Sequence, residues 1–467
     1  MTDNRQSQGG FLMKFVRWSL PVVVAAAVCL SAASAFAAVP VEPGTAKPGQ
    51  FQPSTSCGCH ASLVEQWTPT MHAKALTDPL YLTKLEEADK ATDGALGPFC
   101  KKCHGPAATM LGEIASGNLG EVGKEGVTCT FCHYTVGLKD GVPANTSHLV
   151  ELDGVRRAQL KDPKAPHPAA YSAFHESAEI CGGCHNVNHP INGMHLEATY
   201  SEWKAGPWAK EGVTCQDCHM SQEPGVIGPF TGEAAGGAPT RDNIYKMSFV
   251  GGNVAQGPAE LATARLQSAA TMKLEMPEIV APGQTASLTV SITNSGAGHK
   301  LPTGLTEVRQ MWLDVYAVGA DGAKVPIGEH RFGTILQDDK GNAPVELWEA
   351  TKIKSDDRIG PRETFTESFS FAMPAEAEKA EVVAVLNYQS APDDFAAKAG
   401  VDNPTTEMVK ATQAVFGSEE AKAAAAEQPE GEKVPGESWN VWVIVLGMAA
   451  VFGLLVFFWL KSRKIDA

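Results

Sequence analysis

The chain has 467 residues, more than one domain usually needs, so two globular domains with additional segments are expected. Aromatic residues make up only 7% of it, whereas 45 glycines and 30 prolines indicate many turns, which argues against a helix-rich enzyme with a single core. The formal net charge of -15 makes nucleic acid a poor partner.

The first 38 residues have the pattern of a secretory signal peptide. Lys14 and Arg17 precede an apolar run at residues 20–30, and Ala35-Phe36-Ala37 follows as a cleavage site. An uncleaved N-terminal anchor is the alternative. In either case the pattern predicts that the following residues lie outside the cytoplasm.

Residues 39–220 contain every cysteine outside the signal peptide and eleven of the thirteen histidines. Four segments in this domain have the form Cys-x-x-Cys-His: Cys100/Cys103/His104, Cys129/Cys132/His133, Cys181/Cys184/His185 and Cys215/Cys218/His219. Two thiols at this spacing can each bond one vinyl group of a haem, while the adjacent imidazole reaches the iron. Zinc sites and disulfides are the alternatives, but neither needs a histidine at that position, so we predict covalently bound haem c.

A fifth segment, Cys57-Gly58-Cys59-His60, is one residue shorter, and Ser56 stands where the first cysteine of a regular motif would be. We interpret it as a fifth haem site, bound through Cys59, with Cys57 making a strained second bond or none. A disulfide or a metal-binding cysteine pair is the alternative. The expected cofactor is therefore four to five haem c groups.

Low-spin iron needs a second axial ligand, usually histidine and sometimes methionine. Eight histidines remain after the five motif histidines are assigned as proximal ligands. The foremost candidates are His72, His167 and His175, followed by His189, His195 and His148, for which a surface or hydrogen-bonded role is the alternative.

His299 stands in a loop rich in glycine and proline, at residues 296–304, which can project an imidazole toward the first domain. An ordinary loop histidine is the alternative. His330, between Glu329 and Arg331, is interpreted as a surface residue.

The second half of the chain predicts a different architecture. Residues 221–261 are rich in Gly, Pro and Ala and predict an extended linker. Residues 262–412 contain alternating apolar and polar positions at 286–292, 311–318, 363–371 and 381–386, separated by turn signals. This pattern favours an antiparallel β-sandwich of immunoglobulin-like type. Residues 413–438 are interpreted as a flexible tether.

Residues 439–460 are apolar or glycine except Asn440, which is long enough for one transmembrane helix. Lys461, Arg463 and Lys464 follow, so residues 461–467 are predicted to be a cytoplasmic tail. A buried core helix is the alternative. The predicted location is the cell inner membrane, with one crossing and both domains in the periplasm.

Several stretches resemble one family, the multihaem c-type cytochromes related to hydroxylamine oxidoreductase and its tetrahaem electron acceptor, in the branch with an appended β-sandwich and a membrane anchor. These stretches are residues 59–73, 126–129, 166–181 and 200–220, and the loop at His299. The resemblance implies that His72, His167 and His175 are axial ligands. The family often has histidine where Met247 stands, so Met247 becomes a candidate thioether ligand, with an ordinary core or surface methionine as the alternative.

The predicted fold class is therefore mixed: a loop-and-helix-rich multihaem cytochrome c domain, an antiparallel immunoglobulin-like β-sandwich and one C-terminal transmembrane helix. The expected function is electron relay between the quinone pool, or a membrane oxidoreductase, and periplasmic acceptors. The partners would be a quinol-oxidising or cytochrome b-type subunit and periplasmic cytochromes. One alternative is a reductase of a small nitrogen or sulfur oxyanion, which needs a haem with an open position. Another is a non-catalytic scaffold or sensor subunit.

Overall fold

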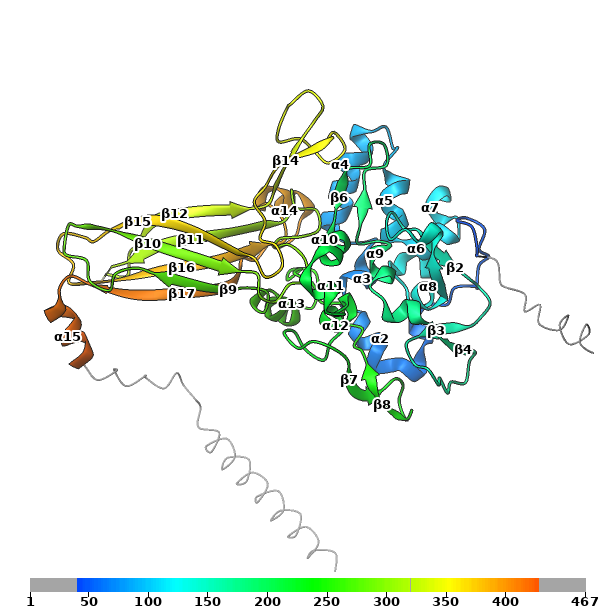
Figure 1. Cartoon of the computed structure of the whole chain (residues 1–467). Coiled ribbons are helices and arrows are strands. Elements are labelled where there is room, and N and C mark those ends of the chain that lie inside the picture. The colour runs from blue at the N-terminus through cyan, green and yellow to red at the C-terminus, as the bar shows by residue number, and fades with distance from the viewer. Residues whose placement is uncertain (1–39, 320, 428–467) are drawn as a thin grey trace, which may run out of the picture.

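A computed structural model describes residues 40–319 and 321–427. It has two parts, an N-terminal domain of short helices and loops and an elongated pair of β-sheets (Figure 1). The signal peptide predicted at residues 1–38, the segment at 439–460 and the tail at 461–467 lie outside the described residues, as does the end of the predicted tether.

The helices of the N-terminal domain are short because glycine and proline interrupt the chain. Pro79, Pro106 and Pro207 each begin a helix, where the missing N–H of proline costs nothing. The α-helices are α2 (Ala61–Trp67), α3 (Met71–Lys74), α4 (Pro79–Ala91), α5 (Gly97–His104), α6 (Pro106–Met110), α7 (Glu113–Ser116), α8 (Cys129–Tyr134), α9 (Glu179–Gly182), α10 (Thr199–Ala205), α11 (Pro207–Lys210), α12 (Cys215–His219) and α13 (Ala259–Gln267). The 3₁₀ turns are η2 (Ser54–Ser56), η3 (Gly58–His60), η4 (Val122–Glu125), η5 (Lys139–Gly141) and η6 (Ala173–Glu176).

Four small strand pairs complete this domain. They are β1 (Thr135–Leu138) with β2 (His148–Val150), β3 (Arg156–Ala158) with β4 (Ala169–Tyr171), β5 (Val187–Asn188) with β6 (His195–Glu197), and β7 (Phe230–Glu233) with β8 (Thr240–Ile244). Only the β3–β4 pair is parallel among these four. The β7–β8 hairpin lies within the segment at 221–261, for which the sequence predicts an extended linker.

The buried apolar residues of the N-terminal domain form small, separate clusters. One contains Phe51, Phe131, Tyr134 and Val150, and another contains Tyr200 and Trp203. Burial of this extent stabilises short helices only weakly. Two motif helices border these clusters, since Phe131 and Tyr134 belong to α8 and Cys215 of α12 packs against the Tyr200 cluster.

The second part consists of two antiparallel sheets. One has the order β15 (Thr364–Ala372), β10 (Thr285–Thr293), β9 (Thr271–Glu275); the other has the order β12 (Lys324–Phe332), β11 (Gln310–Val318), β16 (Lys379–Gln389), β17 (Thr406–Phe416). The alternating segments at 286–292, 311–318, 363–371 and 381–386 fall on β10, β11, β15 and β16, which confirms those predicted strands. α14 (Asp393–Ala399) lies between β16 and β17, and α15 (Glu419–Glu427) follows β17.

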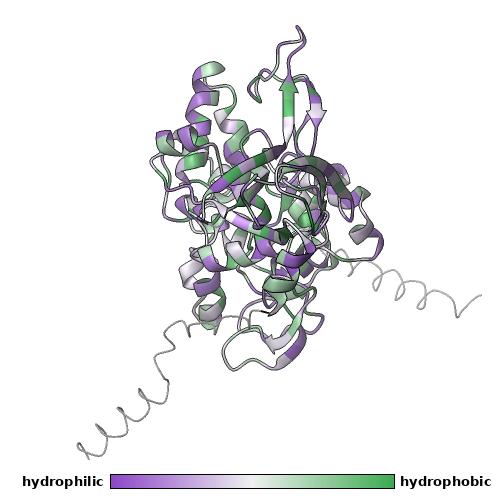
Figure 2. Ribbon diagram, turned by 90° about the vertical axis from the view of Figure 1, so that its left-hand side faces the viewer, coloured by the Kyte–Doolittle hydropathy of each residue, from purple (hydrophilic) through white to green (hydrophobic). Residues whose placement is uncertain are grey.

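One apolar core joins the two sheets. Leu288, Val290 and Ile292 alternate inward along β10, and Leu313 and Val315 do so along β11. Period-two patterning buries one face of each strand and leaves the other in water. Hydrophilic and hydrophobic residues accordingly alternate along the elements (Figure 2).

The sandwich is held against the N-terminal domain by a buried ion pair. Arg358 donates to Glu202 at 2.5 Å, and each side chain is only 7% exposed. Glu202 also accepts hydrogen bonds from the Lys300 backbone and the Thr303 hydroxyl. These contacts place the loop at residues 295–304 on the N-terminal domain.

A strand pair, β13 (Thr334–Gln337) with β14 (Lys352–Asp356), extends from the sandwich over the N-terminal domain (Figure 1). Leu336, Leu347 and Ala350 of this arm pack against Met194 and Leu196. The second domain therefore contacts the first at several places, among them the Glu202 pair, the arm, and Ala391 and Ala396, which pack against Leu80 of α4.

The predicted transmembrane helix requires a correction. Within residues 40–319 and 321–427, none of the helices has the length and apolar character needed to cross a membrane. The membrane-spanning helix of the predicted fold class, and the single-pass inner-membrane location inferred from it, are corrected on this finding. The described fold is mixed helix and sheet, with several small sheets beside the sandwich.

Candidate haem-binding sites

Each regular motif begins on or beside a short helical turn. Cysteines three residues apart and the histidine after them share one face of such a turn, so the three side chains point the same way. In α8 the Thr128 hydroxyl caps the helix by accepting from the Phe131 backbone N–H. In α12 Thr214 and Asp217 form a capping box. The repeated Thr-Cys dipeptide is thus explained, since the threonine starts the helix that carries the motif.

The ten cysteines at these motifs are free, including Cys57 and Cys59 of the irregular segment. The disulfide considered for that pair is therefore not formed. In the part of the chain that the structure describes, no group of three or more His, Cys, Asp or Glu side chains is placed to hold a metal ion.

Four of the five motif histidines donate one ring N–H to a backbone carbonyl. His60, His104, His133 and His219 do so from Nδ1, each at 2.7 Å, to the carbonyls of Ala234, Ala75, Arg157 and Val250 in that order. A carbonyl only accepts, so Nδ1 must carry the proton and Nε2 keeps its lone pair. This hydrogen bond orients each ring as an axial ligand of a metal needs.

Four motif histidines also face a second histidine from a distant segment. The ring centres of His133 and His175 are 5.9 Å apart, and those of His219 and His299 are 6.3 Å apart. The His72–His185 pair is at 6.3 Å and the His60–His167 pair at 6.4 Å. Metal–imidazole bonds are about 2.0–2.1 Å, so two imidazoles on one metal have ring centres roughly 6 Å apart. All four separations fit a shared iron.

His72, His104, His175 and His219 are uncharged at neutral pH, as metal ligands must be. Burial lowers the pKa of His72 and of His219 to about 3, and that of His104 and of His175 to about 4. Neighbouring imidazoles lower the pKa of His72, His219 and His104 further. The lone pairs therefore remain available at neutral pH.

One short segment serves two motifs. His72 of α3 faces His185, and the Ala75 carbonyl that follows the helix holds His104. Gly126 packs on this segment so closely that a Cβ there would lie 2.4 Å from the His72 oxygen, and its φ of +68° also favours glycine. The glycine of Gly-Val-Thr-Cys therefore secures the position of His72.

His104 differs from the other four motif histidines. Among the described residues no histidine faces it; instead the Tyr81 ring stacks on it at 3.7 Å and 9°. Buried oxygens without a hydrogen-bond partner surround this motif, on Tyr81, Asp89 and Glu197. Burial, and the Cys100 and Cys103 thiols, raise the pKa of Tyr81, so its hydroxyl stays protonated. Among the described residues, this motif differs from the other four in having a stacked tyrosine where they have a facing histidine.

The remaining candidate ligands do not belong to the four facing histidine pairs. His189 is buried, but its Nδ1 accepts from the Ile191 and Asn192 backbone, and His195 is exposed on β6. The His148 Nε2 donates to the Ile180 carbonyl at 2.8 Å. The Met247 backbone N–H donates to Gln66, and no imidazole contact of its side chain is described. His330 pairs with Glu367 on the sandwich, as a residue outside the motifs.

Contacts between thiols show which motifs are neighbours. A hydrogen bond between Cys57 and Cys129 lowers the pKa of Cys57 to about 6 and raises that of Cys129. Hydrogen bonds also join Cys103 to Cys184 and Cys181 to Cys215. The first lowers the pKa of Cys103 and raises that of Cys184, and the second raises the pKa of Cys181. Cys132 also lies close enough to raise the pKa of Cys181. The five motifs therefore form one branched series, with the 181–185 motif at the branch.

Sequence reasoning missed the carbonyl acceptors, Tyr81 and Glu197. A backbone carbonyl has no residue signature, and Ala75, Ala234 and Val250 are ordinary apolar residues. Tyr81 lies in an amphipathic helix that shows no motif. No sequence signal for these roles is evident, because each depends on the approach of distant segments.

Comparisons with known proteins agree with this geometry. The family described as cytochrome c554 and c-prime matches residues 56–134. The structure of a penta-heme cytochrome c552 from Thermochromatium tepidum is similar with a TM-score of 0.58 and 21% identity, over 80% of this chain and all of that chain. A CARDB domain of the PF1109 protein from Pyrococcus furiosus aligns over 32% of this chain and 85% of that domain at 15% identity. Its TM-score of 0.18 is too low to indicate a shared fold. No curated protein matches the chain.

These findings support a c-type cytochrome of the multihaem kind, with haem c as its cofactor. The family match covers the irregular first motif and the two motifs after it, at residues 57–60, 100–104 and 129–133. The structural likeness, at this level of identity, concerns the fold.

Proposed function

We propose that this protein is an electron carrier with five haem c groups, one at each motif. The observation that carries the proposal is the pairing of four motif histidines with histidines from distant segments, at separations of 5.9–6.4 Å. Haem c would supply a one-electron redox couple at each motif. The cysteines would hold it covalently, with His60, His104, His133, His185 and His219 as proximal ligands.

The second axial ligands would be His167, His175, His72 and His299, for the motifs of His60, His133, His185 and His219 in that order. Two histidines on one iron occupy both axial positions and leave no place for a substrate. Such sites suit electron transfer, since oxidation and reduction then require little rearrangement of ligands. The 57–60 motif is counted as a haem site because His60 donates to a backbone carbonyl and faces a second histidine, as histidines of the regular motifs do.

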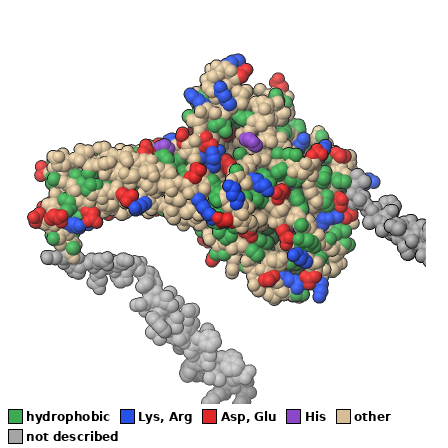
Figure 3. All heavy atoms as spheres, viewed as in Figure 1, with side chains coloured by type: hydrophobic (Ala, Val, Ile, Leu, Met, Phe, Trp, Pro, Cys, Tyr) green, Lys and Arg blue, Asp and Glu red, His purple; other side chains and the backbone are tan. Residues whose placement is uncertain are grey.

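The neighbouring motifs support a relay from one side of the domain to another. The 57–60 motif contacts the 129–133 motif, and Cys59 is exposed, so this end of the series lies at the surface. We propose other redox proteins as donor and acceptor, including a quinol-oxidising or cytochrome b-type subunit and periplasmic cytochromes. The net negative charge favours partners with a basic patch, and acidic side chains gather at the tip of the sandwich (Figure 3).

Intact mass of the mature, holo protein tests the number of haems. Five groups are expected, and replacing Cys59 and His60 together by alanine should remove one of them. His330→Ala, on the sandwich and outside the motifs, is the control and should leave the count unchanged. A mass that corresponds to four groups in the unsubstituted protein would contradict the assignment of the irregular motif.

A second candidate function rests on His104. It has no facing histidine among the described residues, and buried oxygens of Tyr81, Asp89 and Glu197 lie around its motif. An open axial position there would permit reduction of a small nitrogen or sulfur oxyanion, with the Tyr81 hydroxyl able to donate a proton or hydrogen bond.

Addition of cyanide to the oxidised protein distinguishes the two functions. If the reductase is correct, one haem is high-spin in the resting protein and its absorption changes on cyanide binding. If the protein is only a carrier, every haem is low-spin and cyanide leaves the spectrum unchanged. Replacing Tyr81 by phenylalanine should alter the response to cyanide if the protein is a reductase, and should leave the spectrum unchanged if it is only a carrier.

A further inference from the structure

Helix α10 lies beside the start of the 215–219 motif. The Trp203 indole N–H donates to the Val213 carbonyl at 2.8 Å, two residues before the first cysteine of the motif. Trp203 is buried, and Cys215 packs against its cluster. One side chain of α10 therefore fixes the backbone that leads into the helix of His219.

The neighbouring residue of α10, Glu202, holds the loop that lies opposite this motif. Its Oε2 accepts from the Lys300 backbone N–H at 3.2 Å and from the Thr303 hydroxyl at 2.9 Å. Its Oε1 pairs with Arg358 at 2.5 Å, and both side chains of that pair are buried. Each oxygen of this carboxylate thus has a partner within the chain, which is what a buried charge requires.

A single residue, Lys300, connects Glu202 with the ring of His299. The His299 Nδ1–H donates to the Lys300 carbonyl at 2.9 Å, so Nδ1 carries the proton and Nε2 keeps its lone pair. The backbone N–H of Lys300, in turn, donates to Glu202. Because the ring is bonded to Lys300 and Lys300 to Glu202, the orientation of this imidazole depends on a carboxylate of the other domain.

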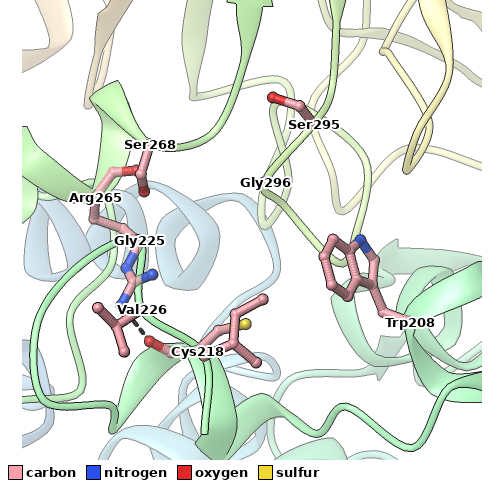
Figure 4. A pocket seen from close by; sticks show the side chains of 9 residues that line it. Trp208, Cys218, Gly225, Val226, Arg265, Ser268, Ser295 and Gly296 are labelled. Atoms are coloured by element: carbon pink, nitrogen blue, oxygen red, sulfur yellow. Dashed lines mark hydrogen bonds between the residues drawn. The ribbon is translucent and has the colours of Figure 1, made fainter.

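The sandwich holds the same loop from its own side. Asn294 is fully buried, and its side-chain amide donates to the His299 carbonyl at 2.8 Å. Ser295 lines one pocket together with Cys218 (Figure 4). The loop therefore lies against the 215–219 motif, and Glu202 holds it from the side of the N-terminal domain.

We propose that Glu202 is a positioning residue for the centre at the 215–219 motif, where it keeps His299 in place opposite His219. This role rests on the proposed function, because it belongs to one of the histidine-paired centres. Groups that hydrogen-bond to metal ligands orient them and strengthen metal binding, and Glu202 does so one step further out, through Lys300. The ligand comes from one domain and its support from the other, so this centre is complete only when the two domains are docked.

Electron paramagnetic resonance of the oxidised, full-length holo protein tests this role. In Glu202→Gln an amide supplies one oxygen where the carboxylate supplies two, so either the loop or Arg358 loses its acceptor. One low-spin centre should become high-spin, as in His299→Ala, while the other centres keep their signals. Free imidazole added to Glu202→Gln should restore the lost low-spin signal, because it can bind in place of the displaced ring.

Thr303 offers two variants that leave the buried charges intact. Thr303→Val removes the hydroxyl that bonds Glu202 and Thr199, so it should give the same centre a smaller high-spin fraction than Glu202→Gln does. Thr303→Ser keeps a hydroxyl and should match the unsubstituted protein. Glu211→Gln is the matched control, because Glu211 also pairs with an arginine of the sandwich, Arg362, but is half-exposed and bonds to that arginine rather than to the loop. Its spectrum should be unchanged.

An unchanged spectrum in Glu202→Gln, with one low-spin centre lost in His299→Ala, would overturn the positioning role and leave the proposed function intact. Loss of several low-spin centres in Glu202→Gln, or no recovery with imidazole, would also overturn it, since the residue would then act through the stability of the domain. If His299→Ala retains every low-spin centre, the histidine pairing of the proposed function is itself wrong. Intact mass of each variant shows separately whether every haem is attached, and a haem missing from Glu202→Gln would again contradict a role in positioning alone.

Discussion

Histidines of this chain have environments that their local sequences do not distinguish. His175 lies opposite a motif histidine, whereas buried His189 caps a turn by accepting two backbone N–H groups. Neither histidine belongs to a Cys-x-x-Cys-His motif. Their roles follow from what lies on the other side of the ring, which is a property of the tertiary structure.

Replacing His299 by alanine is the sharpest test at this scale. It removes the imidazole that faces His219, so one low-spin centre should become high-spin. Electron paramagnetic resonance of the oxidised protein measures the change. His330→Ala is the control, because His330 pairs with Glu367 on the sandwich, and its spectrum should match the unsubstituted protein. A low-spin count that stays the same in His299→Ala would show that the facing rings do not share an iron.

Short helices are the elements that present the motifs, and their ends matter more than their lengths. α12 spans only Cys215–His219, too few residues for an independent helix. Its stability depends on the Thr214 cap and on contacts such as the Gln216 amide, which donates to the carbonyls of His175 and Ser177. The His133–His175 pair is therefore held partly by α12, the helix of the 215–219 motif.

Thr214→Ala should lower the free energy of unfolding by about 1 kcal/mol, the usual contribution of an N-cap hydroxyl. The loss arises because the Asp217 N–H and the Asp217 carboxylate both lose the hydroxyl as partner. Urea unfolding of the holo protein measures it. Thr231→Ala, at an exposed position of β7 without a described side-chain hydrogen bond, should change stability much less. Equal effects of the two substitutions would refute the capping role.

At the scale of the whole molecule, the sandwich completes the N-terminal domain. It places His299 opposite His219 and contributes Arg358 to the buried pair with Glu202. Gly296 lets the loop of His299 pack against the end of α13, since a Cβ there would lie 2.0 Å from the Ser268 oxygen. Docking of the two domains is thus coupled to the geometry of one motif.

The pH dependence of this docking follows from Asp356. Burial opposes its ionisation, but hydrogen bonds from Arg358 and Lys300 outweigh this and lower its pKa to about 2. Since the folded pKa is below the unfolded value, the carboxylate contributes stability above about pH 4 and loses it as the pH falls toward 2. Because Asp356 is partly exposed, solvent screens this interaction, and its contribution to stability is about 1 kcal/mol.

Asp356→Asn should therefore reduce stability by about 1 kcal/mol at pH 6, and the difference should shrink as the pH falls toward 2. Urea unfolding at a series of pH values, followed by tryptophan fluorescence, measures both. Asp339→Asn, at an exposed position nearby, is the control and should show no such convergence. A difference that is constant from pH 6 to pH 2 would contradict the assigned role of Asp356.

The sequence by itself determined those features whose chemistry is local. Two cysteines and a histidine within five residues contain all that is needed to hold a haem, and period-two alternation shows the strands of the sandwich. The same reasoning went wrong where apolar composition alone predicted a membrane-spanning helix, because none of the described helices is long and apolar enough.

Only the tertiary structure decided which groups meet. The pairs of His219 with His299, of His60 with the Ala234 carbonyl, and of the Arg265 guanidinium with the Cys218 carbonyl each join segments that are remote along the chain. The motif of His104 has the same form as the other regular motifs, so the sequence did not show that a tyrosine, and among the described residues no histidine, faces it. The physical reason is that a metal ligand, a hydrogen bond and a counter-charge each require a partner, and here the chain brings most partners from far away.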